Sequence, residues 1–287
     1  MPELGLKIIW SAIIPLAPLI FFLIPNIWTS MCPLSSFQVL PDRLGLKRPP
    51  YTLSDGQIHR LRILSWVLLF IIVPARHLVL NTNATLLALT IMATLLLASV
   101  LGLTFKGLSG WCTGLCPIRP VEMMYGQFNL ESNRPEACTM CKRCNVPCSR
   151  LNVHNPGVLA SNNARFRYFI YAFPGFVLGY FLVPPASTIL SVYAIMALSS
   201  LMSSYFFWLV AFDMADEDTG ETASAMAIIS ALCIYYAFTV PGIIQTWGLA
   251  QEWTAIFYTL VYSVIALNLM RYWYQRNVRA SVAVAAG

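Results

Sequence analysis

The sequence predicts an all-α integral membrane protein with about seven transmembrane helices. Of its 287 residues, 58% are hydrophobic and only 10% are charged, which is far too apolar for a soluble domain. The chain also contains seven apolar stretches near the length that a helix needs to cross a bilayer, about 20 residues. Six of its eight cysteines crowd between two of these stretches. The first two observations set the class, and the third indicates a specialised function.

The apolar stretches are assigned as helices because an open sheet would leave backbone donors unpaired in lipid. No alternating ten-residue pattern suggests a β-barrel. Most tryptophans fall near the ends of the stretches, where amphipathic rings settle at the membrane surface. The predicted spans are residues 8–28, 63–80, 84–105, 167–184, 187–211, 224–243 and 254–273.

The first span is predicted to be retained rather than cleaved as a secretory signal. Its apolar stretch exceeds the usual ~7–15 residues of a signal, and no small-residue cleavage site follows it. Pro15, Pro18 and Pro25 are expected to kink this helix or to break its ends.

Lysine and arginine concentrate in three segments, the connections 29–62 and 106–166 and the C-terminal tail. The connections on the opposite side contain neither residue type. The positive-inside rule therefore places the N-terminus outside and these three segments in the cytoplasm, as in a bacterial-type inner (cytoplasmic) membrane. A net charge of +6 then reports topology and contact with anionic lipid rather than nucleic-acid binding.

Seven of the eight cysteines fall on the predicted cytoplasmic side, where thiols are kept reduced. They are therefore expected to bind metal rather than to form crosslinks. These residues are Cys32, Cys112, Cys116, Cys138, Cys141, Cys144 and Cys148. Cys233 alone lies inside a predicted span, and we interpret it as a small packing residue.

The last four cytoplasmic cysteines carry the most specific motif in the chain. Cys138, Cys141, Cys144 and Cys148 have the spacing C-x2-C-x2-C-x3-C, which bacterial ferredoxins wrap around a [4Fe–4S] cluster. Zinc is the competing metal, but zinc sites generally need two cysteine pairs separated by a loop. The spacing therefore predicts a ferredoxin-like, cysteine-rich cytoplasmic loop that binds iron and sulfide.

The remaining cytoplasmic cysteines leave the number of clusters open. If the four-cysteine run closes one cube, Cys32, Cys112 and Cys116 are left for a second site that is one ligand short. Such an incomplete cluster would need His154 or an open iron as its fourth position. One full cluster fits the inventory of ligands better than two.

The motifs together, "GWCTGLCP…YG" and "CTMCKRCNVPC", resemble the membrane polyferredoxins of the NapH type and the related membrane part of NosR-type proteins. The match covers about residues 108–150. A fainter one, "WTSMCPL" at 28–34, has Trp28 where the family's C-x3-C-P motif has its first cysteine. The resemblance implies cytoplasmic clusters and electron transfer between the quinol pool and partner redox proteins.

The chain departs from the family pattern in three ways. It has one ferredoxin run instead of two, and Ser149 instead of proline follows Cys148. Four predicted spans come after the cluster region, where a NapH-type protein would nearly end. The resemblance therefore implies electron transfer more firmly than any named pathway, and one interpretation is that the last spans dock a partner subunit.

Other cofactors are limited by the residues available. Of the three histidines only His77 lies in a predicted span, so this chain alone cannot build a bis-histidine haem in the membrane. Cytoplasmic clusters therefore need a quinone, a haem-bearing partner or both to move electrons across the bilayer. Arg76 and His77 are candidates for contact with a quinone headgroup. The alternative, which we favour, is that they extend to the membrane surface.

These observations divide the chain into a first transmembrane helix (1–28), a cytoplasmic loop, a helix pair (63–105), an iron–sulfur segment (106–166), a four-helix region (167–273) and a tail (274–287). No nucleotide-binding, zinc-peptidase or serine-hydrolase motif is present. The sequence favours an electron-transfer subunit of a membrane oxidoreductase complex over a stand-alone enzyme. The alternative is a redox-active assembly or sensing factor that serves the maturation of another metalloenzyme.

Overall fold

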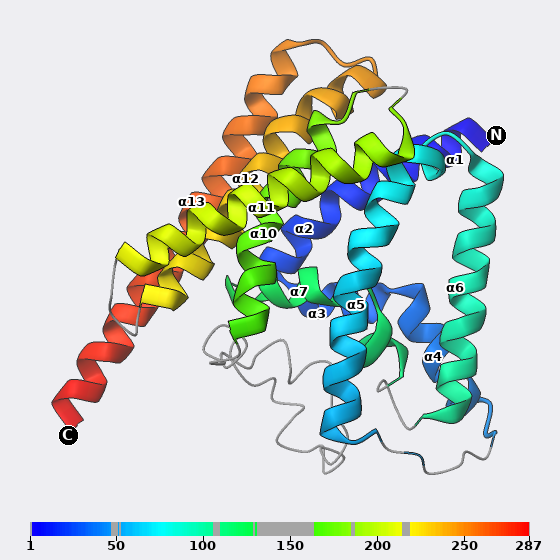
Figure 1. Cartoon of the computed structure of the whole chain (residues 1–287), viewed down its shortest axis with the longest axis horizontal. Coiled ribbons are helices and arrows are strands. Elements are labelled where there is room, and N and C mark those ends of the chain that lie inside the picture. The colour runs from blue at the N-terminus through cyan, green and yellow to red at the C-terminus, as the bar shows by residue number, and fades with distance from the viewer. Residues whose placement is uncertain are drawn as a thin grey trace.

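The computed structural model describes residues 2–46, 51, 53–105, 110–128, 130, 164–184, 187–213 and 219–286 (Figure 1). These residues form helices and no named strand, apart from an isolated bridge between Tyr51 and Phe105. The long helices are α5 (Asp55–Ala75), α6 (Ala84–Thr104), α10 (Ala164–Leu182), α11 (Ile189–Asp213), α12 (Thr219–Thr246) and α13 (Glu252–Ala286). The shorter elements are α1 (Pro2–Ile8), η1 (Ile9–Ile13), α2 (Ile14–Leu23), α3 (Pro25–Met31), α4 (Pro33–Arg43), η2 (Arg76–Leu80), η3 (Trp111–Leu115), α7 (Arg119–Tyr125) and η4 (Gly126–Phe128).

Six helical stretches among the described residues are long and apolar enough to cross a membrane. They are Glu3–Leu23, Gly56–Leu80, Ala84–Thr104, Ile189–Phe212, Thr222–Thr246 and Glu252–Gln275. This supports an all-α, multi-pass membrane protein, but it does not confirm the count of seven. The predicted span 167–184 forms α10, which is helical but is not one of the six. Arg165 and Arg167 near its start and Pro174 within it interrupt the apolar sequence of α10.

Helix α10 nevertheless runs beside α5 over most of its length. The rings of Trp66 and Phe169 stack with centroids 5.1 Å apart, and those of His77 and Tyr180 meet edge to face at 5.5 Å. From the first pair to the second, the residue number rises by eleven in each helix (77 − 66 and 180 − 169). The two helices, α5 and α10, therefore run parallel. Most of its aromatic side chains are wholly or partly buried between helices rather than exposed to lipid.

The first span begins and ends earlier than the apolar pattern predicts, covering Glu3–Leu23 instead of 8–28. Pro15 has no N–H to donate to the helix. The π-helical turn η1, which ends two residues before Pro15, accommodates the missing hydrogen bond. Pro18 is accommodated within α2. The helix ends at Ile24, and Pro25 starts α3 in a new direction, which is the position that proline favours.

Helices α10, α11 and α12 pack closely on one another. A Cβ atom on Gly175 of α10 would lie only 1.9 Å from the carbonyl oxygen of Ser199 in α11, and Gly179 makes a similarly close approach. Ala227 and Ala231 of α12 are fully buried against the same core. Small residues allow backbones to approach closely, which is a main source of helix association in lipid.

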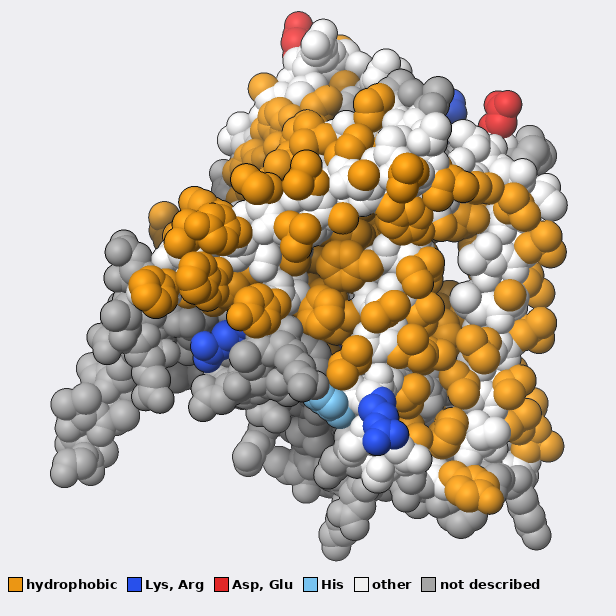
Figure 2. Space-filling model, in the orientation of Figure 1, with side chains coloured by type: hydrophobic (Ala, Val, Ile, Leu, Met, Phe, Trp, Pro, Cys, Tyr) orange, Lys and Arg blue, Asp and Glu red, His pale blue; other side chains and the backbone are white. Residues whose placement is uncertain are grey.

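Helix α6 is the least covered of the long helices. All residues of 88–93 are exposed, and six consecutive residues sample every face of a helix. Its C-terminal part packs closely on α4, where a Cβ atom on Gly102 would lie 2.1 Å from the carbonyl oxygen of Gln38. Figure 2 shows hydrophobic side chains covering most of this face of the molecule, as expected for a surface in lipid.

Several short elements fold back against the long helices between the spans. The segments 29–62 and 106–166 are predicted as loops, but α3, α4, η3, α7 and η4 occupy much of their described parts. Among them, η3 and α7 lie against α5, and α4 lies beside α6 (Figure 1). Two of the corners between these elements are Cys-Pro pairs, Cys32-Pro33 and Cys116-Pro117. These two corners position the candidate site.

Candidate functional site

Two Cys-Pro corners of nearly identical shape define the candidate site. Cys32 ends α3 with φ −62° and ψ 121°, and Cys116 ends η3 with φ −61° and ψ 118°. Pro33 and Pro117 follow them, and a proline pushes the preceding residue into this extended conformation. Each corner therefore stops one helical element and redirects the chain, leaving its cysteine at the bend.

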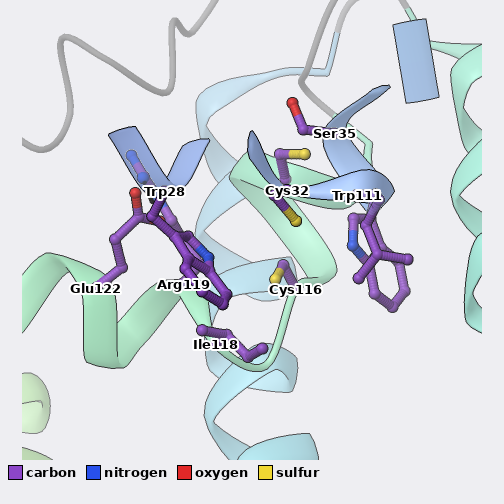
Figure 3. A pocket seen from close by; sticks show the side chains of 10 residues that line it. Trp28, Cys32, Ser35, Trp111, Cys116, Ile118, Arg119 and Glu122 are labelled. Atoms are coloured by element: carbon purple, nitrogen blue, oxygen red, sulfur yellow. Dashed lines mark hydrogen bonds and ion pairs between the residues drawn. The ribbon is translucent and has the colours of Figure 1, made fainter. Parts of the chain in front are cut away.

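Both corners and Cys112 border a single small pocket (Figure 3). It is lined by Trp28, Cys32, Leu34, Ser35, Trp111, Cys112, Cys116, Ile118, Arg119 and Glu122. The cavity measures about 30 Å³, which is room for one or two water molecules or a single ion. The fold thus brings together three cysteines that are up to 84 positions apart (116 − 32).

Buried polar side chains from α4 and α5 hold the second corner in place. The backbone N–H of Cys112 donates to Oε1 of Gln38 at 3.0 Å, and the hydroxyl of Ser65 donates to the carbonyl oxygen of Cys116. Gln38 and Ser65 are both almost fully buried. Because Ser65 lies ten residues into α5 (65 − 55), the corner sits about 15 Å along that helix rather than at its end.

A buried ion pair forms one wall of the pocket. Arg119 and Glu122 are only 4% and 6% exposed, and Nη1 of the guanidinium lies 2.8 Å from Oε2 of the carboxylate. The pair spans one turn of α7, with Pro120 near its start. The sequence does not predict the pair, because both residues fall in an expected loop. The i, i+3 spacing beside a proline was the available signal.

The three thiols of the pocket are held in the neutral form. Burial raises the pKa of Cys32, Cys112 and Cys116, and that of Cys116 reaches about 12. The negative charge of Glu122 adds to the effect of burial at Cys32 and Cys116, while a hydrogen bond with the Ser35 hydroxyl opposes it at Cys112. Without a metal or another cation, these cysteines are therefore thiols rather than thiolates at neutral pH.

The indole of Trp111 presents a donor to the same pocket. Trp111 is 4% exposed, and its Nε1 is buried without a hydrogen-bond partner among the described residues. Thr113, two residues on, also has a buried hydroxyl without a described partner. Buried donors normally find an acceptor, so a water molecule or another small acceptor in the pocket would satisfy the indole.

Some of the predicted ligands belong to the described part of the structure and others do not. Cys138, Cys141, Cys144 and Cys148 lie outside the described residues, as does His154. Within the part of the chain that is described, no group of three or more His, Cys, Asp or Glu side chains is arranged to hold a metal ion.

The three cysteines named for a possible second site come together at the pocket. Cys32, Cys112 and Cys116 all line it, around a cavity of about 30 Å³. Cys233 lies apart from them in α12, where its carbonyl oxygen accepts a hydrogen bond from Tyr262 at 3.0 Å.

Arg76 and His77 lie at the other end of α5 and pack against protein. The guanidinium carbon of Arg76 lies 4.0 Å from the ring centroid of Trp10 and 5.2 Å from that of Tyr180. Its Nε also donates to Oδ1 of Asn81 at 3.0 Å. These contacts join α5, η1 and α10 at that end of the bundle, and such cation–π contacts are worth more where they are shielded from water.

Comparisons of the chain with known protein families, with characterised proteins and with solved structures find no match. The resemblance to membrane polyferredoxins therefore depends on the cysteine motifs alone. The features that bear on its function are therefore these motifs and the pocket lined by Cys32, Cys112 and Cys116, here called the thiol pocket.

Proposed function

We propose that the protein is a membrane-bound iron–sulfur electron-transfer subunit that passes electrons between the quinone pool and a partner redox protein. The observation that carries this proposal is the C-x2-C-x2-C-x3-C run at 138–148 within a multi-pass membrane protein. Four thiolates at this spacing suit one [4Fe–4S] cluster, which when bound supplies one-electron transfer. The pocket of three further cysteines supports a redox role for the same part of the chain.

The described chain that leads into this run is hydrogen-bonded to the membrane helices. The N–H of Leu130 donates to the carbonyl oxygen of Leu23 at the end of α2, at 2.8 Å. The guanidinium of Arg271 in α13 donates to the carbonyl oxygen of Leu130 at 3.0 Å, and Nδ2 of Asn268 to that of Phe128. Contacts between α13 and the chain that enters the cysteine-rich segment give the last helices a role in supporting it.

The proposal includes the sidedness of the protein in a bacterial-type inner membrane. The distribution of lysine and arginine favours an external N-terminus and a cytoplasmic four-cysteine run. We include α10 as a seventh crossing because it runs parallel to α5, one of the six apolar spans. Several residues of α10 are buried against other helices of the bundle.

Metal analysis of anaerobically purified protein tests the proposal. We expect close to four irons and four acid-labile sulfides per chain, with a paramagnetic signal on reduction. Cys141→Ser should abolish or reshape that signal because a hydroxyl replaces a thiolate poorly as a ligand for iron. Cys233→Ser is the matched control and should leave it unchanged. Zinc without sulfide in the wild-type protein would rule the proposal out.

A further inference from the structure

Two of the three cysteines of the thiol pocket hold equivalent positions. Cys32 and Cys116 occupy Cys-Pro corners with nearly the same backbone conformation, and both line the same cavity. We propose that Cys32 and Cys116 form a thiol–disulfide couple that exchanges two electrons with a quinone. The choice of quinone as oxidant rests on the proposed function, whereas the pairing of the two cysteines rests on the pocket.

The geometry of the corners favours these two cysteines as partners. Figure 3 shows the side chains of Cys32 and Cys116 extending into the same space between α3 and η3. Both cysteines occupy extended positions directly before a proline, which fixes the backbone on the C-terminal side. Both side chains line this cavity of about 30 Å³, so the two thiols face the same small space.

Cys112 borders the pocket but has other partners. Its thiol hydrogen-bonds with Ser35, and its backbone N–H donates to Gln38 at 3.0 Å. At the first corner the position that corresponds to Cys112 is Trp28, four residues before Cys32, and Trp28 also lines the pocket. The element shared by the two corners is therefore the cysteine before the proline.

The chemistry suits a buried site because it changes no charge there. Oxidation breaks the two S–H bonds, forms one S–S bond and releases two electrons and two protons. A quinone that takes up both electrons and both protons becomes a quinol, so the reaction balances without a further reactant. Thiols and disulfide are all neutral, whereas a metal centre requires thiolates, whose charge burial opposes. In reducing compartments, disulfides of this kind are usually transient and catalytic or redox-sensing.

Chemical fragmentation offers a direct test. The iron-replete protein is reduced, freed of reductant and treated anaerobically with a tetrasubstituted benzoquinone, which has no open ring position for thiol addition. It is then alkylated in denaturant and cleaved at methionine with cyanogen bromide. Cleavage after Met31, Met92 and Met123 puts Cys32 alone in fragment 32–92, and leaves Cys112 and Cys116 as the cysteines of fragment 93–123.

We expect quinone to link these two fragments, with a product two hydrogens lighter than the sum of the thiol forms, and dithiothreitol to separate them. The link should disappear in Cys32→Ser and Cys116→Ser, and it should remain in Cys112→Ser. Retention of the cluster signal in each variant would show that the variant is folded. A link that needs Cys112 instead of Cys116 overturns the pairing. So does the absence of any link in wild-type protein.

The iron content of the same samples separates the two proposals. Four irons per chain without a link would overturn the thiol–disulfide couple and leave the electron-transfer proposal standing. A link in protein that contains no iron would support the thiol–disulfide couple and overturn the electron-transfer proposal. Near eight irons, with Cys32 and Cys116 protected from alkylation until iron is removed, would show that the pocket opens to hold a second cluster and would overturn this inference.

Discussion

The thiol pocket and the α10–α12 core are held together by different forces. In the core, Gly175 lets α10 approach the backbone of α11, and alanines of α12 pack beside them. Around the pocket, buried polar groups such as Gln38 and Ser65 instead bind the backbone of the cysteine motif. Close apolar packing thus holds the long helices, whereas directed hydrogen bonds hold the cysteines.

The difference predicts which substitutions unfold the protein and which alter only the site. A change in the small residues of the core should affect the whole bundle, because interiors packed this closely relax little. A change in the hydrogen bonds of the pocket should affect the position and reactivity of the thiols with a smaller loss of stability.

The largest effect is expected for Gly175→Val in the core. A Cβ atom at this position would lie 1.9 Å from the carbonyl oxygen of Ser199, so backbone rather than a flexible side chain must move. We expect loss of folded protein, measured as the monodisperse fraction after detergent extraction. The matched control is Gly242→Ala in α12, where an added Cβ would meet no atom within 4 Å. Equal recovery of both variants would contradict the tight packing of α10 on α11.

The next effect is expected at the buried ion pair of the pocket. Glu122→Ala leaves the guanidinium of Arg119 without its carboxylate partner in a site that is 4% exposed. Breaking such a pair typically costs about 3–5 kcal/mol. Thermal unfolding in detergent should show a marked fall in midpoint, whereas Glu252→Ala, at an exposed position of α13, should change it little. A small loss in Glu122→Ala would mean that water reaches this wall of the pocket.

These two sites also show what the sequence could and could not predict. Long apolar runs predict membrane helices well, because the bilayer fixes their length. The sequence also predicts a span at 167–184, which forms α10, although this helix is not among the six apolar stretches. The ion pair was missed because a loop was expected at 106–166, and polar residues there are normally solvated.

The pocket itself was only partly predictable. The Cys-Pro pairs are visible in the sequence, and Cys32, Cys112 and Cys116 were grouped as one candidate site. The bond from Ser65 to Cys116 was not predicted, because nothing local to "GWCTGLCP" indicates that its chain turns back against α5. Such contacts connect residues 51 positions apart and depend on how whole helices pack.

A smaller effect is expected for Ser65→Ala, which removes the hydroxyl that binds the carbonyl oxygen of Cys116. A typical hydrogen bond contributes about 0.5–1.5 kcal/mol, so the unfolding midpoint should fall only slightly. The same change should loosen the second corner and speed alkylation of Cys116. Ser203→Ala is the matched control, because the Ser203 hydroxyl donates to the carbonyl oxygen of Tyr171 in the core at 2.7 Å. Faster alkylation of Cys116 in both variants would contradict a local role for Ser65.

The smallest effect, and the one most specific to the pocket, is the pH dependence of thiol reactivity. Burial, followed by further contributions that include the charge of Glu122, raises the pKa of Cys116 to about 12. Only the thiolate attacks an alkylating reagent, so its population in the folded protein should grow about tenfold per pH unit well below that pKa. A free thiol with a pKa near 8.5 instead approaches full ionisation, and a constant rate, above about pH 9.5.

The two curves should therefore separate on the alkaline side. Site-resolved alkylation of folded protein from about pH 7 to about pH 10 should show the rate at Cys116 still rising where that of a cysteine in an unstructured peptide with blocked ends has levelled off. The raised pKa also makes the stability of the fold depend on pH. Below the pKa of the unfolded chain, the thiol is protonated in both states and does not change the free energy of unfolding. Above that pKa, the unfolded chain loses a proton that the folded site retains. Stability should thus fall from about pH 9 towards about pH 12, and less so in Cys116→Ser. A Cys116 rate that levels off with the free thiol would show that the pocket admits water, and would remove the contrast between the thiol pocket and the packed core.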